Sequence, residues 1–85
     1  MPEKKEKLKA NLAMNLQYLR IRHKLSQVSL AKHLEISPRS ISYYESGRYL
    51  PPAHVLCAMA LYFGYTVEEL LGEHLPANKG GSTNK

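Results

Sequence analysis

A set of hydrogen-bonding side chains near the middle of this 85-residue chain has a spacing that suggests recognition chemistry. Intervals of three and four residues place them on one face of a helix. The members of this face are Arg39, Ser42, Tyr43 and Ser46. An arginine supplies five N–H donors, and hydroxyl groups both donate and accept hydrogen bonds. The face is therefore suited to binding an array of planar polar groups.

Two short helices, joined by a turn of about three residues, must position this face. They lie within LSQVSLAKHLEISPRSISYYESG, residues 25–47. Ser26 occupies an N-cap position, Ser37 and Pro38 start the second helix at about residues 38–46, and Gly47 is placed to end it. This arrangement is typical of a helix-turn-helix, whose second helix enters the major groove of double-stranded DNA.

Three further helices are expected around this pair. A broad apolar stripe before residue 24 predicts a first helix, with Leu8, Leu12, Leu16, Leu19, Met14, Tyr18 and Ile21 on its buried side. Val28, Leu30, Ala31 and Leu34 are expected on the inner face of the second helix. After Pro51 and Pro52 comes a nearly all-apolar helix, and Thr66 to Glu69 form a capping box for a short one. Because no alternating strand pattern occurs, the predicted fold class is all-α with five helices.

Charge is distributed unevenly along the chain, whose formal net charge is +5. Residues 20–48 hold six Lys and Arg against two Glu, whereas residues 49–75 hold no Lys or Arg. A basic face opposite an uncharged or acidic one is expected of a protein that binds a polyanion. We expect a basic N-terminal extension at 1–9, the DNA-binding domain at 10–75 and a disordered tail at 76–85.

The composition argues against several other classes of protein. The sequence shows no apolar run of membrane-spanning length and no signal peptide, which predicts a cytoplasmic protein. Its four histidines lack ligand spacing, so no metal or other cofactor is expected. Cys57 is expected to be an inert core residue. Because no nucleophile–base arrangement is evident, no enzymatic activity is expected.

The segments NLQYLR, LSQVSLAKHLEIS, SISYYESGR and LYFGYTVEELLG, within residues 12–71, resemble the phage-repressor and Cro-type (lambda-repressor-like) helix-turn-helix family. The resemblance implies five helices and binding to operator DNA as a dimer. It also implies a nucleoid-associated protein that is encoded by a bacterium or phage. It implies that Gln27 holds a phosphate and braces the recognition helix, that Ser37 meets phosphate oxygen, and that Arg48 contacts the DNA backbone. It implies base reading by Arg39 and Tyr43, with Ser42 between them.

The resemblance also implies a structural pair of Arg20 and Glu45, which would tie the first helix to the recognition helix. Four positions depart from the family pattern. Ser29 stands where relatives often have Glu, so the capping box of the second helix is missing. Glu35 stands where a turn glycine is usual, which costs about 1–2 kcal/mol if the residue is left-handed. Pro38 allows only an apolar contact, such as one with a thymine methyl group. Pro52 replaces the usual hydroxyl cap.

Three functions stay open at this point. The first is a transcriptional repressor or regulator that binds a palindromic operator, as a homodimer at least on DNA. The second is an antitoxin that autoregulates its operon and binds a protein partner, and the third is a protein-interaction module without specific DNA reading. Candidate dimer contacts are Leu61, Tyr62, Tyr65 and Leu75. The N-terminal lysines are either a solvated helix end or a phosphate-binding arm.

Overall fold

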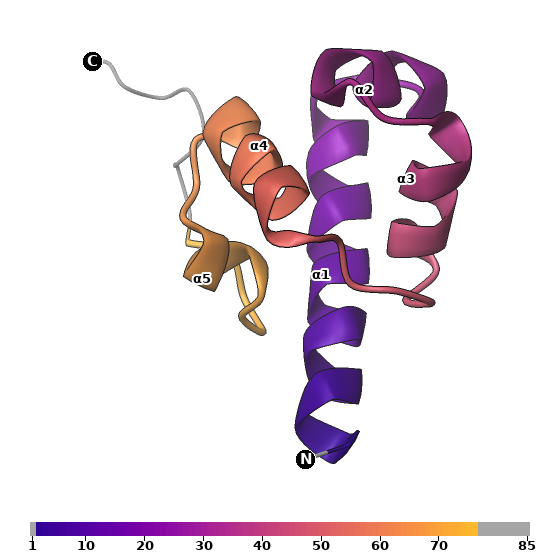
Figure 1. Cartoon of the computed structure of the whole chain (residues 1–85). Coiled ribbons are helices and arrows are strands. Elements are labelled where there is room, and N and C mark those ends of the chain that lie inside the picture. The colour runs from indigo at the N-terminus through magenta and orange to yellow at the C-terminus, as the bar shows by residue number, and fades with distance from the viewer. Residues whose placement is uncertain (1, 77–85) are drawn as a thin grey trace.

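Five α-helices make up the computed structural model, which describes residues 2–76 (Figure 1). They are α1 (Pro2–Arg22), α2 (Gln27–Leu34), α3 (Pro38–Glu45), α4 (Ala53–Phe63) and α5 (Val67–Leu70). The predicted all-α fold with five helices is confirmed, and no strand occurs in the described range. The disordered tail predicted at 76–85 falls outside that range, apart from its first residue.

The longest helix, α1, is the spine of the molecule. Figure 1 shows α2 across one end of α1, α3 along one side, and α4 and α5 on the opposite side. Contacts join α1 to α3 and α5, α2 to α3 and α4, and α4 to α5. In the part of the chain that the structure describes, no helix has the length and apolar character needed to cross a membrane.

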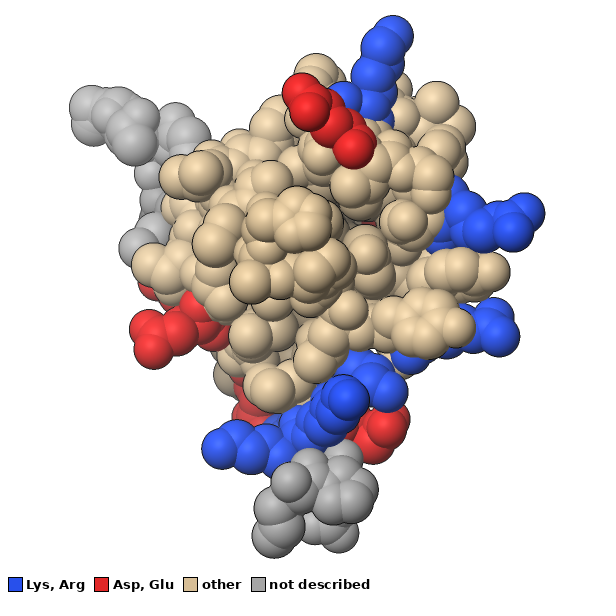
Figure 2. All heavy atoms as spheres, in the orientation of Figure 1, with Lys and Arg blue, Asp and Glu red and all other residues tan. Residues whose placement is uncertain are grey.

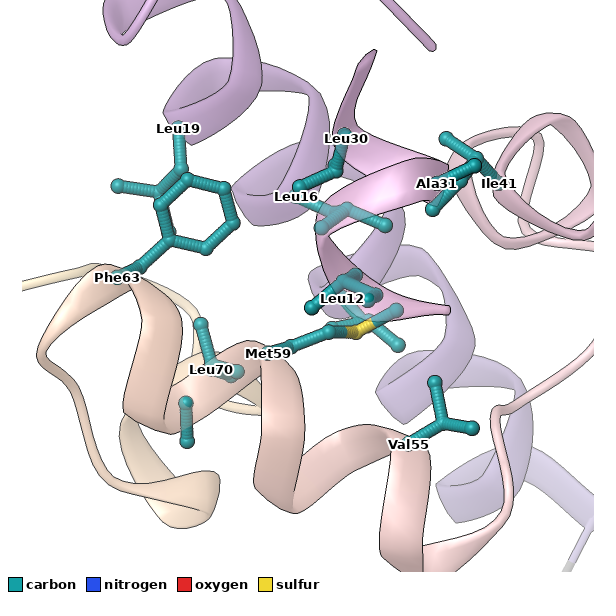
Figure 3. Packing of buried hydrophobic residues seen from close by; sticks show 12 residues of the cluster. Leu12, Leu16, Leu19, Leu30, Ala31, Ile41, Val55, Met59, Phe63 and Leu70 are labelled. Atoms are coloured by element: carbon teal, nitrogen blue, oxygen red, sulfur yellow. The ribbon is translucent and has the colours of Figure 1, made fainter. Parts of the chain in front are cut away.

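All five helices contribute to one hydrophobic core (Figure 3). Its largest side chains with less than 2% of their surface exposed are those of Phe63, Leu12, Leu16, Leu19, Leu30, Ile41, Met59 and Leu70. Most of the predicted inner positions are therefore buried. Burying such apolar side chains supplies the main favourable free energy of folding.

Several apolar residues that were predicted to face inward do not. Met14, Tyr18 and Ile21 are each more than half exposed, because α1 packs through a narrower stripe than the sequence suggested. Val28 lies on the other side of α2 from Leu30 and Leu34 and is exposed. Cys57 is exposed on the outer side of α4, so its assignment to the core was wrong.

The caps that define the helix-turn-helix segment form as predicted. The Ser26 hydroxyl accepts a hydrogen bond from the Ser29 N–H, and the Ser37 hydroxyl accepts one from the Ser40 N–H. Pro38 is the first residue of α3. Gly47 follows the helix with φ +77°, a conformation that glycine adopts without a steric penalty. The start and end of α3 are thus encoded locally.

The turn before α3 contains the left-handed residue that the sequence suggested. Glu35 has φ +60°, and its backbone N–H closes the end of α2. Lys24, after α1, also has a positive φ, of 58°, which the sequence did not suggest. Pro52 makes no side-chain cap for α4, whereas Thr66 and Glu69 form the predicted capping box of α5.

Two asparagines hold the C-terminal part of the domain against α1. Asn15 is 7% exposed and donates to the carbonyl oxygens of Leu70 (2.8 Å) and Gly72 (3.0 Å). Asn11 donates to the Leu71 carbonyl at 2.9 Å. These bonds satisfy carbonyl groups at the end of α5 that have no partner within the helix. The short α5 is therefore held by side chains from α1.

The lysine-rich segment that was predicted as an N-terminal extension forms the first turns of α1, which begins at residue 2. Lys7 forms an ion pair with Glu73 beyond α5, and Lys9 forms one with Glu6 at 3.2 Å. The hydrogen bond between Lys7 and Glu73, reinforced by their charges, raises the pKa of Lys7 and lowers the pKa of Glu73. A DNA-contacting role for these lysines stays a prediction.

Candidate nucleic-acid interface

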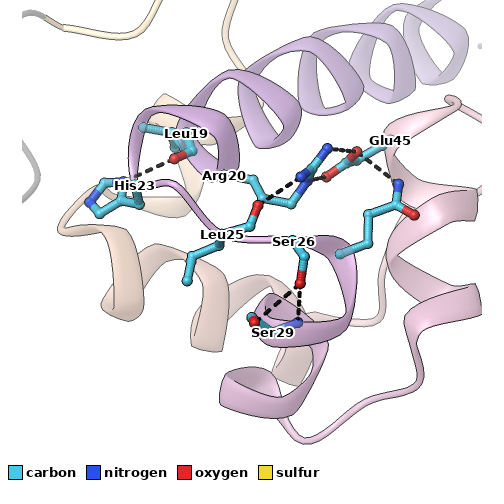
Figure 4. Close-up of polar contacts among 8 residues, drawn as sticks. Leu19, Arg20, His23, Leu25, Ser26, Ser29 and Glu45 are labelled. Atoms are coloured by element: carbon cyan, nitrogen blue, oxygen red, sulfur yellow. Dashed lines mark hydrogen bonds and ion pairs between the residues drawn. The ribbon is translucent and has the colours of Figure 1, made fainter.

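One carboxylate fixes α3 to both α1 and α2 (Figure 4). Glu45 accepts from Arg20 Nε at 2.6 Å, from Arg20 Nη2 at 3.2 Å and from Gln27 Nε2 at 3.1 Å. Arg20 Nη1 also donates to the Leu25 carbonyl at 2.8 Å. The Glu45 side chain is 4% exposed and that of Arg20 is 14% exposed, so the predicted pair is present and largely buried. Gln27 braces α3 through this carboxylate.

The outer face of α3 presents two side chains with free hydrogen-bonding groups. Arg39 and Ser42 are both exposed. Within residues 2–76, neither the Arg39 guanidinium nor the Ser42 hydroxyl has a hydrogen-bond or ion-pair partner. Pro38, at the first position of the helix, is exposed beside them and offers only apolar contact. This face is open to an external hydrogen-bonding partner.

Two other hydroxyls of the predicted site are already engaged within the protein. Ser37 Oγ accepts from the Ser40 N–H at 3.1 Å and lies 3.0 Å from Ser40 Oγ. Ser46 Oγ donates to the Tyr43 carbonyl at 2.9 Å. Both residues are exposed, so their remaining lone pairs and nearby backbone face solvent. Their hydroxyl groups have fewer hydrogen-bonding options than that of Ser42.

Tyr43 is half-buried, whereas its place on the predicted polar face led us to expect an exposed side chain. Its ring meets that of Tyr49 in a T-shaped contact, with the centroids 5.4 Å apart. Arg48 Cζ lies 5.0 Å from the Tyr43 centroid and 5.8 Å from that of Tyr49. The sequence reasoning missed Tyr49, although an aromatic beside an arginine after the Gly47 turn was a usable signal.

Comparison with known proteins identifies this arrangement of helices. A family model described as helix-turn-helix matches residues 16–70, well over half of the chain. The chain belongs to the lambda-repressor-like helix-turn-helix family. Members of this family bind double-stranded DNA, and DNA-binding transcription regulation is the function class of the chain.

The names of two relatives describe HTH-type regulators of transcription. The chain is 41% identical over 61 residues to the HTH-type transcriptional activator BcrR of Enterococcus faecalis, a match covering 71% of this chain and 30% of that protein. It is 36% identical over 55 residues to an uncharacterised HTH-type transcriptional regulator of Methanocaldococcus jannaschii, covering 65% of this chain and 83% of that protein. No solved structure gives a significant match.

Charged side chains are distributed unevenly over the surface of this helix-turn-helix protein. Lys and Arg side chains lie along the side occupied by α2 and α3 and around the N-terminal part of α1, whereas the α4 face is uncharged (Figure 2). None of the eleven residues of α4 is Lys, Arg, Asp or Glu. No cluster of three metal-ligating side chains occurs within the described residues. The electrostatic attraction for a phosphate backbone therefore acts on the side where α3 is exposed.

Proposed function

We propose that the chain binds a palindromic operator as a homodimer, with α3 in the major groove, and represses transcription from the adjacent promoter. The observation that carries this proposal is the contrast between the two sides of α3. Its inner side is fixed by the buried Glu45, whereas Arg39 and Ser42 on its outer side have free hydrogen-bonding groups. A rigid helix with free donors on its outer face suits base reading.

Base reading is assigned mainly to Arg39. Its guanidinium has the donor geometry to bind guanine O6 and N7 together, the commonest specific contact in the major groove. Ser42, one helical turn further along, can contact either partner of the next base pair. Pro38 has no N–H, so its ring is assigned to a thymine methyl group. Arg39 is then the first side chain of α3 that can hydrogen-bond a base.

Contacts with the DNA backbone are assigned to residues around α3. Arg48 is exposed, and within residues 2–76 its guanidinium has no hydrogen-bond acceptor. Gln27 Nε2 has a second N–H beyond the one that binds Glu45, and this N–H can donate to a phosphate oxygen. Ser37 and Ser46 flank α3 and supply further polar groups. Such contacts fix the position of the protein on the duplex without reading sequence directly.

The proposed dimer uses the uncharged side of the molecule. Leu61 on α4 is 84% exposed and Tyr62 is also exposed, whereas Tyr65 and Leu75 are half-buried against the core. The first two are therefore the principal candidates for contact between copies. This surface lies across α1 from α3 (Figure 1), so a second copy can bind there while α3 stays accessible. Two-fold symmetry of the protein then matches a palindrome in the DNA.

Repression is proposed because occupation of a promoter by a small DNA-binding domain is enough to exclude polymerase. The relative from Enterococcus faecalis is named as an activator, so the direction of regulation needs its own test. A reporter with the selected site placed over the promoter should be repressed. An increase in transcription, with the site either over or upstream of the promoter, would contradict repression and leave DNA binding intact.

The DNA-binding part is tested by selecting bound sequences from random DNA and then measuring variants on the selected and scrambled sites. We expect Arg39→Ala to lose about 1–3 kcal/mol on the selected site and to relax one base preference per half-site. Arg39→Lys keeps the charge and should recover only the loss shared with scrambled DNA. Arg22→Ala is the matched control, because Arg22 is exposed on α1 and its Nη1 donates to the Tyr18 hydroxyl.

Arg48→Ala should give a different pattern. A phosphate contact carries no sequence information, so affinity should fall equally for selected and scrambled DNA, and the salt dependence should flatten by about one unit of slope. Equal losses on both DNAs for Arg39→Ala would instead make Arg39 a phosphate ligand. If the unaltered chain shows no affinity for DNA at low salt, the proposal fails, and a protein-interaction module becomes the better assignment.

A further inference from the structure

We propose that Tyr43 and Tyr49 form a platform that orients the Arg48 guanidinium toward the DNA backbone, which makes Tyr49 a positioning residue for DNA binding. The proposal rests on the proposed DNA-binding function and deepens it. It also gives Tyr43 a different role from the base reading that the sequence predicted.

The three side chains form a compact cluster just beyond the end of α3. The Tyr43 and Tyr49 rings are nearly perpendicular, at 84°, with their centroids 5.4 Å apart. The Arg48 guanidinium carbon lies within 6 Å of both centroids, the range of a cation–π interaction. Tyr49 is 51% exposed, so this cluster sits at the surface.

The backbone brings the cluster together. Gly47, with φ +77°, turns the chain directly after the C-cap residue of α3. The Arg48 N–H then donates to the Tyr43 carbonyl at 3.0 Å, which places Arg48 beside the last turn of the helix. Tyr49 follows in the chain, and its ring contacts that of Tyr43. The position of the arginine relative to α3 is therefore set by local bonds and ring contacts.

The chemistry of this arrangement favours an anion as the partner. When a guanidinium packs against aromatic rings, its N–H groups at the edge stay available, and a phosphate oxygen is the acceptor that they match. Within residues 2–76 neither the Arg48 guanidinium nor the two phenol hydroxyls have a hydrogen-bond partner. Holding a long side chain in place before binding reduces the entropy lost when the contact forms.

The test compares Tyr49→Ala, Tyr49→Phe, Arg48→Ala and the Arg48→Ala/Tyr49→Ala double variant on selected and scrambled DNA. We expect Tyr49→Ala to raise Kd about two- to five-fold on both DNAs, the effect expected of a cation–π contact at an exposed site. Tyr49→Phe keeps the ring and should bind nearly as well as the unaltered protein. The double variant should bind no worse than Arg48→Ala, because Tyr49 acts through Arg48.

Tyr18→Ala is the matched control. Tyr18 is another exposed tyrosine beside an arginine, but it lies on α1 and accepts from Arg22. It should leave Kd unchanged, and equal melting temperatures should show that both tyrosine variants fold.

An unchanged or lower Kd for Tyr49→Ala, or losses that multiply in the double variant, would overturn the platform. In either case the unaltered chain would still prefer its selected site, so the proposed function would stand. Loss of that preference in the unaltered chain would instead reject the function itself.

Discussion

The ion pair between Arg20 and Glu45 offers a test of how α3 is held in place. Arg20→Ala removes three hydrogen bonds, two to the Glu45 carboxylate and one to the Leu25 carbonyl. It leaves a carboxylate that is only 4% exposed with Gln27 Nε2 as its one remaining hydrogen-bond donor among the described side chains. A buried charge that loses its partner destabilises a protein by about 3–5 kcal/mol.

This loss is large for a domain of this size. Typical stabilities of about 0.05–0.15 kcal/mol per residue give a chain of 85 residues roughly 4–13 kcal/mol in total. Since about 1 kcal/mol shifts the melting temperature of a small domain by about 4–8 °C, Arg20→Ala should lower it by at least about 12 °C. Thermal denaturation followed by circular dichroism measures this shift directly.

A double variant separates the cost of the unpaired charge from the value of the pair. Replacing Arg20 with Met and Glu45 with Leu removes both charges and keeps most of the side-chain volume. Its stability should lie well above that of Arg20→Ala, because no buried carboxylate is left unpaired. A melting temperature for Arg20→Ala within about 2 °C of the unaltered protein would refute the reasoning, since a pair of that kind would have to be exposed to solvent.

Three other features give shorter predictions. Glu35→Gly should stabilise the chain by up to about 1 kcal/mol in urea denaturation, because glycine adopts the left-handed φ of +60° without strain. The gain is limited because glycine also makes the unfolded chain more flexible, and a lower urea midpoint would contradict the prediction. Lys7→Met should change the melting temperature only slightly. The loss should be largest between about pH 4.5 and 10.5. It should shrink as the pH falls through the lowered pKa of Glu73 or rises through the raised pKa of Lys7, so a loss that does not change with pH would contradict the assignment. Leu61→Glu should prevent dimerisation in sedimentation experiments and weaken binding to the full palindrome while a single half-site is bound as before; an unchanged palindrome affinity would place the interface elsewhere.

The sequence was most informative where structure is determined by neighbouring residues. The caps Ser26 and Ser37, the left-handed Gly47 and Glu35, and the capping box at Thr66 all depend on groups within a few residues of one another. The spacing of the leucines along α1 likewise fixes which side of the helix packs. These features define the five helices and locate α3.

The predictions failed where a side chain binds groups far away in the sequence, where neighbouring helices decide burial, or where a nearby backbone group takes up a side-chain hydroxyl. Asn15 binds carbonyl groups 55 and 57 residues away, and a lone asparagine in an apolar stripe gives no sign of that. Met14 and Ile21 fit the helical period, but they lie on a part of the α1 surface that no neighbouring helix covers. The sequence suggested that the Ser46 side chain is free to bind a partner. Its hydroxyl instead donates to the Tyr43 carbonyl, three residues earlier, as serine near a helix end commonly does.

The hydroxyl of Ser46 is already engaged and Tyr43 is half-buried, so few side chains of each copy are left to read bases. Under the proposed function, a bidentate pair between Arg39 and guanine would supply about 1–3 kcal/mol of discrimination, and the single hydroxyl of Ser42 no more than that. About 10⁶ competing genomic sites correspond to roughly 8 kcal/mol, since each tenfold step equals about 1.4 kcal/mol. A single copy supplies at most about 6 kcal/mol and falls short of that requirement, whereas two copies on a palindrome can reach it, with at most about 12 kcal/mol. The small number of free donors on α3 therefore supports the proposal that a second copy binds alongside the first.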